Sequence, residues 1–295
     1  MGATISGSME PGVVALVVIT FVAAFVNGAL GYGFSSITVP VGLLFFSNRV
    51  LNPALVLIEV FINLYVLFIN RASIPAVRRR VLPILIGLAP GVALGSYVLA
   101  SIHPGWLKFV TYALLLPLLL VQAGGLRYPI KAEKLVGVPF GAGLGFLYSV
   151  TTISGPPLAL LFNNQGYVKR DFRAGLAVIR VAESTLTAIV YYHLGMFTVQ
   201  TLGLVETILL GVLIGIPLGA FAIRKLDPET FRRVCMSFDV WIVGFGLSKV
   251  LIDLKLAQGA GAYSVMLAAI LIDAVLLYVF FSRNVSLRRN RPAAG

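Results

Sequence analysis

Long apolar runs, separated by short basic loops, follow one another along almost the whole chain. Hydrophobic residues make up 59% of the 295 residues and charged residues only 12%, about half of the ~25% that is typical of soluble domains. A soluble protein of this size could not bury so much apolar surface, whereas about 20 apolar residues can cross a bilayer as one helix. The sequence therefore predicts an all-α polytopic membrane protein.

Two pairs of adjacent apolar segments are interrupted in the middle, unlike ordinary spans. Their arms cover 12–33 with 35–47, and 135–150 with 153–163. At a rise of about 1.5 Å per residue, the arm 153–163 is too short to cross the membrane. We therefore expect each pair to be a hairpin of broken helices that enters and leaves on one side. Full spans are predicted at 52–70, 81–101, 105–123, 172–194, 199–223, 231–251 and 263–282.

The basic residues constrain the topology, because loops rich in Lys and Arg stay in the cytoplasm. If both hairpins return to their starting side, 18 of the 23 Lys and Arg residues fall on one face and four on the other. The remaining one, Arg180, lies within a span. This asymmetry predicts an external N-terminus and a cytoplasmic C-terminus. The 18 residues form five clusters: Arg71, Arg78, Arg79 and Arg80; Arg127, Lys131 and Lys134; Lys169, Arg170 and Arg173; Arg224, Lys225, Arg232 and Arg233; and Arg283, Arg288, Arg289 and Arg291.

The order of the predicted segments repeats: a hairpin and three spans, first starting outside and then starting inside. Ile37–Phe45 also resembles Ile153–Phe162, although apolar segments can resemble one another by chance. Paired broken helices in inverted-topology repeats are typical of secondary transporters. The predicted units are a first repeat, 1–124, with the hairpin 12–47; a second repeat, 125–252, with the hairpin 135–163; and an extra helix with a basic tail, 253–295.

The two interruptions share hydroxyl side chains followed by proline, in "NGALGYGFSSITVP" from Asn27 and in "TTISGPP" from Thr151. Non-helical backbone in a membrane requires burial in protein or a water-filled cavity, and helix N-termini attract anions. We interpret the interruptions as an anion site between two short helices. Close packing of glycines between helices is the alternative reading. Candidate substrate-binding residues here are Asn27, Tyr32, Ser35, Ser36, Thr38, Thr151, Thr152 and Ser154.

Ionisable residues inside predicted spans are costly and therefore indicate function or pairing. Arg180 offers a permanent charge and a planar fork that matches oxyanions, so it is the candidate cation of the anion site. Glu59 and Glu183 are each candidates for two roles, a structural partner of Arg180 or a carrier of coupled protons. Asp239 is a third proton-carrier candidate.

The glycine-rich "NGALGYGFSSITVP", its counterpart "GAGLGFLYSVTTISGPP" (Gly141–Pro157) and the two-half layout resemble the TauE/SafE family of sulfite exporters. The resemblance spans nearly the whole chain. It implies export of sulfite, sulfoacetate or another sulfur-containing anion across the bacterial inner membrane.

Two other function classes are weighed against an anion carrier. A membrane-embedded enzyme would need a catalytic motif at a helix break, and the sequence contains none, so we expect no enzymatic activity and no cofactor or metal. An anion channel would use the same helix N-termini and stays an alternative, as does a carrier for another small anion. The expected partners are a small anionic substrate and the lipid bilayer, not nucleic acid, and a homodimer is left open.

Overall fold

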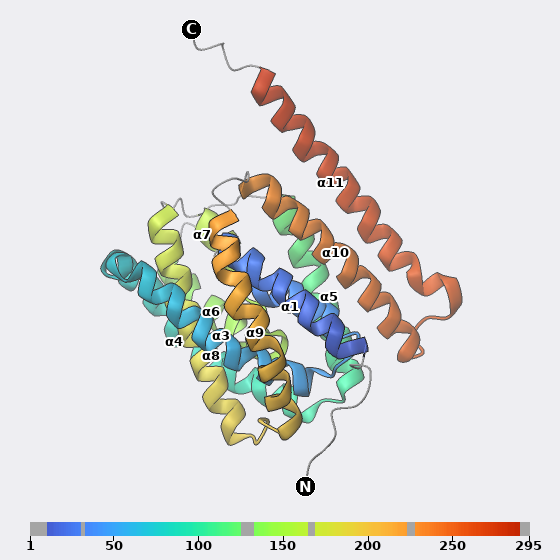
Figure 1. Ribbon diagram of the computed structural model, residues 1–295, viewed down its shortest axis with the longest axis horizontal. Helices are drawn as coiled ribbons and strands as arrows, with labels where there is room; N and C mark the ends of the chain where they lie inside the picture. Colours follow the sequence, from blue (N-terminus) through green and yellow to red (C-terminus); the bar gives the residue numbers. More distant parts are fainter. Residues whose placement is uncertain (1–10, 31–32, 125–132, 165–168, 223–227, 290–295) are drawn as a thin grey trace.

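The computed structural model describes residues 11–30, 33–124, 133–164, 169–222 and 228–289, and in these ranges the chain is helical and contains no strand (Figure 1). Seven of the described stretches are long and apolar enough to cross a membrane, and one of them, Asn48–Ser101, comprises two helices. The predicted all-helical membrane fold is therefore confirmed. The helices are α1 Pro11–Leu30, α2 Phe34–Gly42, α3 Asn48–Asn70, α4 Ile74–Ser101, α5 Pro104–Ala123, α6 Glu133–Thr151, α7 Gly155–Asn164, α8 Lys169–His193, α9 Val199–Ala222, α10 Pro228–Asp253 and α11 Ser264–Arg289, with 3₁₀ turns η1 Arg71–Ser73 and η2 Gly259–Tyr263.

Both predicted interruptions are present, between α1 and α2 and between α6 and α7. The second arms are short, with 9 residues in α2 and 10 in α7, so neither can cross a bilayer. The chain after α2 returns to the start of α1, since a Cβ atom built on Gly12 would lie 3.1 Å from the Cβ atom of Phe45. The first pair therefore folds back as a hairpin, although α1 alone is long enough to be a candidate span.

The main helix contacts join the two halves of the sequence. α1 packs along α9, α4 along α6, α3 along α8 and α5 along α10, and Figure 1 shows α9 lying across α1 near the middle of the molecule. If each helix of the first half corresponds to the helix numbered five higher in the second half, α1 corresponds to α6 and α4 to α9, so the α1–α9 contact corresponds to the α6–α4 contact. This correspondence supports the predicted inverted repeat, which stays a prediction.

Glycines spaced four residues apart bring the paired helices into backbone contact. On α6, a Cβ atom at Gly141 would lie 2.1 Å from the carbonyl oxygen of Ile84 on α4. On α9, a Cβ atom at Gly219 would lie 1.9 Å from the carbonyl oxygen of Phe25 on α1. Small residues at this spacing are the usual means of close helix packing in membranes. We call these two contacts the glycine seams; their main glycines are Gly28, Gly211, Gly215 and Gly219 in one, and Gly87, Gly91, Gly95, Gly141 and Gly145 in the other.

Two glycines on α6 allow a matched test of the α4–α6 seam. We expect Gly141→Ala to destabilise the protein, because the added methyl group collides with backbone that cannot move aside, and overpacking costs about 1–3 kcal/mol. A Cβ atom at Gly143 would meet nothing within 4 Å, so Gly143→Ala should leave the melting temperature unchanged or raise it. The melting temperatures of the detergent-solubilised variants check this. Equal losses in both would show that the seam is not tightly packed.

The last helix, α11, lies at the edge of the molecule next to α10 (Figure 1), and most of its side chains between positions 264 and 282 are exposed. A buried ion pair joins the two helices: Nη2 of Arg233 lies 2.7 Å from Oδ1 of Asp273. The indole Nε1 of Trp241 donates to the other carboxylate oxygen at 3.1 Å. Arg233 is one of the 18 basic residues that the charge pattern assigns to the cytoplasmic face, an assignment that stays a prediction. Its side chain is only 3% exposed, because it packs against Asp273, and Arg233 is the first residue of a candidate membrane span.

Asp273→Ala should detach α11 from α10 and lower the yield of folded protein. Breaking a buried pair by removing one partner costs about 3–5 kcal/mol, because the other charge stays buried and unpaired. The double variant Arg233→Met with Asp273→Leu removes both charges and should recover most of the yield. Size-exclusion profiles of the purified variants measure this. If the double variant is no better than Asp273→Ala, the ion pair is not what holds α11.

Candidate anion-binding site

Both interruptions contain a residue with a left-handed backbone conformation. Gly33, directly before α2, has φ 105°, and Thr152, directly after α6, has φ 56°. Glycine adopts this conformation without cost, whereas a β-branched residue such as threonine rarely does. The hydroxyl of Thr151 holds the second turn, since it accepts from the amide of Ile153 at 3.1 Å. The two turns point the N-terminal ends of the short helices at carboxylates on α3 and α8.

Glu59, in the middle of α3, meets the first of these ends. Its Oε1 atom accepts a hydrogen bond from the hydroxyl of Ser35 in the first turn of α2, at 2.7 Å. Its Oε2 atom accepts from the hydroxyl of Tyr148 on α6, at 2.6 Å. The side chain is fully buried. Three helices therefore converge on one carboxylate.

Arg180, in the middle of α8, forms an ion pair with Glu59, with 3.0 Å between Nη2 and Oε1. Only 5% of the arginine is exposed. Its Nε atom is buried and has no hydrogen-bond partner among the described residues. The guanidinium fork is thus only partly used, and a buried donor without an acceptor is costly. Such a donor marks a place where an acceptor oxygen from a ligand or water would bind.

Glu183 lies one turn along α8 from Arg180 and meets the second short helix. Its Oε2 atom accepts from the hydroxyl of Ser154, the residue before α7, at 2.6 Å. Its Oε1 atom is buried without a partner among the described residues. Nearby, the amide Nδ2 of Asn63 on α3 donates to the carbonyl oxygen of Arg180 at 3.3 Å. We call Ser35, Glu59, Asn63, Tyr148, Ser154, Arg180 and Glu183 the central polar cluster.

The structure thus brings together Arg180, both candidate glutamates and two of the predicted hydroxyls, Ser35 and Ser154. The sequence interpretation expected the N-terminal ends of the short helices to be open to substrate. Instead, the hydroxyls of Ser35 and Ser154 at these ends donate hydrogen bonds to carboxylates of the protein itself, those of Glu59 and Glu183.

Other predicted residues lie near the interruptions but do not reach the carboxylates. The hydroxyl of Ser36 bonds to the carbonyl oxygen of Gly33 at 3.0 Å, and that of Thr152 to the carbonyl oxygen of Thr151 at 2.7 Å. Thr38 is fully buried, and its hydroxyl has no partner among the described residues. Ser36 and Thr152 therefore support the turns rather than the carboxylates.

Three further candidates lie away from the cluster or outside the described residues. Asn27, near the end of α1, is buried and lines a separate cavity. Asp239 is buried on α10, and its Oδ1 atom has no partner among the described residues. Tyr32 lies outside the described residues.

Tyr148 is a cluster member that sequence reasoning missed. It stands in "LYSVTT", within the second glycine-rich motif, five residues before Ile153, just as Tyr32 stands five residues before Ile37 in the first motif. This matching position was the available signal. The hydroxyl of Tyr148 reaches a carboxylate 89 positions earlier in the sequence, a contact that no local pattern reveals.

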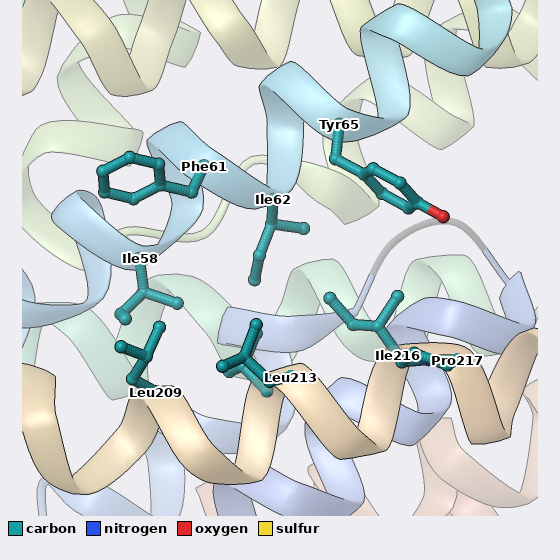
Figure 2. A pocket seen from close by; sticks show the side chains of 9 residues that line it. Ile58, Phe61, Ile62, Tyr65, Leu209, Leu213, Ile216 and Pro217 are labelled. Carbon is teal, nitrogen blue, oxygen red and sulfur yellow. The ribbon is translucent and has the colours of Figure 1, made fainter.

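An apolar groove of about 310 Å³ lies between α3 and α9 and is separate from the cluster. Figure 2 shows Ile58, Phe61 and Ile62 of α3 facing Leu209 and Leu213 of α9 across it. None of these side chains can bind an anion. The cluster, not this groove, has the chemistry that the sequence predicted.

Comparison with known proteins agrees with the resemblance seen in the motifs. A family model described as sulfite exporter TauE/SafE matches residues 16–246. The matched range includes both interruptions and the whole central polar cluster, and it ends before α11. The search of curated proteins and the search of solved structures gave no match.

Proposed function

The chain belongs to the sulfite exporter TauE/SafE family, and we propose that it is a secondary transporter that exports a small sulfur-containing anion, such as sulfite or an organosulfonate like sulfoacetate. In this proposal the membrane is the bacterial inner membrane, with the N-terminus outside and the C-terminus in the cytoplasm. The asymmetry of the basic residues supports this orientation. The protein acts as a transporter and not as an enzyme.

Arg180 is the observation that carries the proposal. A guanidinium buried in the middle of a membrane helix needs a reason, because its insertion costs about 2.5–3.5 kcal/mol. Glu59 accepts from only one nitrogen atom of Arg180, Nη2, and the Nε atom of Arg180 has no acceptor among the described residues. A sulfite or sulfonate group has three oxygen atoms that can accept from such a fork, and charge-assisted bonds are about twice as strong as neutral ones.

The charges of the cluster favour coupling to protons. If both glutamates are ionised, two carboxylates face one guanidinium, and the site repels an anion. A proton on Glu183 would make the cluster neutral and would give its unmatched Oε1 atom a hydrogen to donate. In the proposed mechanism the substrate binds Arg180 while Glu183 holds a proton, and Glu59 gives up its contact with Arg180.

A carrier fits the described contacts better than an open channel does. Glu59 and Glu183 are fully buried, and Arg180 nearly so, so the cluster is closed to water in this conformation. The matching contacts of the two halves support alternating access about an inverted repeat.

A flux assay in proteoliposomes tests the proposal. Labelled sulfoacetate or sulfite should exchange against the same unlabelled anion across the membrane, faster than in protein-free liposomes, and an imposed pH gradient should drive net flux. A conductance without counterflow would indicate a channel. No exchange of any sulfur anion would contradict the proposed function.

A further inference from the structure

A second polar cavity lies at one end of the helices that form the cluster. Its volume is about 380 Å³, and α1, α3, α8 and α9 line it. Asn70 is the last residue of α3 and Arg173 lies near the start of α8, so the cavity opens at the end that is cytoplasmic in the predicted topology. Its polar side chains are Asn27, Asn70 and Arg173, together with the hydroxyl of Tyr65.

The polar groups in this cavity have few partners within the protein. Arg173 is exposed and forms no ion pair or hydrogen bond with the other described residues. Asn27 is only 2% exposed, and its Oδ1 atom has no partner in the described part of the chain. A buried amide oxygen without a partner is costly unless the cavity holds water or a polar ligand, and the exposed guanidinium of Arg173 in the same cavity is free to bind an anion.

The spacing of polar residues connects this cavity with the central polar cluster. Arg173 and Arg180 are seven residues apart on α8, which is two turns, or about 10 Å along the helix. Asn70 and Asn63 have the same spacing on α3, and Asn63 already contacts α8 at Arg180. Leu176, which lines the cavity and is 4% exposed, stands on α8 between the two arginines. Residues at this spacing share one helix face. The cavity and the central polar cluster therefore lie one after the other along the contact between α3 and α8.

We propose that this cavity is a cytoplasmic vestibule in which Arg173 and Asn27 first bind the substrate anion before it passes Leu176 to reach Arg180. This inference rests on the proposed function and names two residues that bind substrate outside the central cluster. The positive charge of Arg173 raises the local concentration of anions at the vestibule. Arg180, two turns deeper, then exchanges its bond to Glu59 for one to the substrate.

The reactivity of a cysteine at position 27 tests the vestibule without relying on transport. In a variant with Cys235→Ala and Asn27→Cys, thiosulfonate reagents of opposite charge should react from the cytoplasmic side, the anionic one preferentially. Arg173→Gln should lower the ratio of anionic to cationic rates about tenfold. Arg79→Gln removes another exposed arginine, from α4, and should leave the ratio unchanged. Sulfoacetate should slow the reaction of Asn27→Cys.

Each other outcome has a definite meaning. A ratio that does not respond to Arg173→Gln, or reaction only from outside, would overturn the vestibule. Protection by anionic phospholipid in the liposomes, but not by sulfoacetate, would reassign Arg173 to a lipid head group and would overturn it as well. If Arg173→Gln lowers the ratio of anionic to cationic reaction rates while no sulfur anion is exchanged in the flux assay, the cavity is an anion-binding vestibule but the proposed substrate class is wrong.

Discussion

Replacing Arg180 by alanine should abolish transport, and replacing it by lysine should leave a reduced rate with weaker substrate affinity. Lysine keeps the charge but loses the planar fork that can bind two oxygen atoms at once. Alanine removes the cation of the central cluster and leaves Glu59 buried beside two hydroxyls alone. Exchange of labelled anion in proteoliposomes measures the rates, and the rise in melting temperature on adding sulfoacetate measures binding.

A double variant separates binding from folding. Removing one partner of a buried ion pair costs about 3–5 kcal/mol, so Arg180→Ala alone could lose transport because it fails to fold. Adding Glu59→Gln relieves the unpaired charge; its amide oxygen accepts from one of the two hydroxyls of Ser35 and Tyr148, and its NH2 group can donate to the oxygen of the other. We expect this double variant to fold and still not to transport. Normal transport by it would mean that Arg180 serves only as the partner of Glu59.

Glu183→Gln should remove the response of flux to a pH gradient while exchange of substrate at equal pH continues. Glutamine has the shape of a protonated glutamate and can still accept from the hydroxyl of Ser154, so the site keeps its structure but can no longer release a proton. We expect a pH gradient to raise net flux about tenfold in the unmodified protein and to have no effect in the variant.

Asp239→Asn is the matched control for proton coupling. Asp239 is also a buried acid with an unmatched oxygen, but it lies on α10 and has no hydrogen bond to the central cluster in the described structure. The variant should keep its response to the pH gradient. If Asp239→Asn loses the response and Glu183→Gln keeps it, the proton site belongs on α10 and the proposed role of Glu183 is wrong.

The sequence was sufficient to predict the helices and the charged members of the cluster. Apolar runs of membrane-spanning length can be read directly from the order of residues, and glycine together with proline marks the interruptions. Arg180, Glu59 and Glu183 stood out because charges inside spans are rare. The partner of Arg180 could not be predicted, since Glu183 one turn away was as available as Glu59. The approach of α3 to α8 decides for Glu59, and that approach depends on packing of the whole molecule.

The hydroxyls show a different limit. Ser35 and Ser36 are neighbours, and successive helical residues point about 100° apart, so only one of them can face Glu59. Helix boundaries predicted from sequence are uncertain by more than one residue. A shift of one residue would put Ser36 instead of Ser35 opposite Glu59, so the sequence could not decide between them. The glycines support both interpretations of the motifs, a break between helices and close packing of helices. Gly33 forms the turn at the break, whereas Gly28 and Gly141 pack against the backbone of a neighbouring helix.

The glycine seams give different parts of the molecule different stiffness. In α1–α9 and in α4–α6 carbonyl groups of one helix lie directly against glycines of the other, where there is no room even for a Cβ atom, so sliding one helix along the other would drive them into bulkier neighbouring residues. The α3–α8 contact is held instead by side chains: the ion pair of Glu59 with Arg180 and the hydrogen bonds of Asn63, which at 3.3 Å and 3.4 Å are longer than usual. The bonds of Asn63 can exchange partners at little cost, and in the proposed mechanism the ion pair exchanges with substrate. The two seamed pairs should therefore move as rigid bodies, with α3 and α8 as the hinge between them.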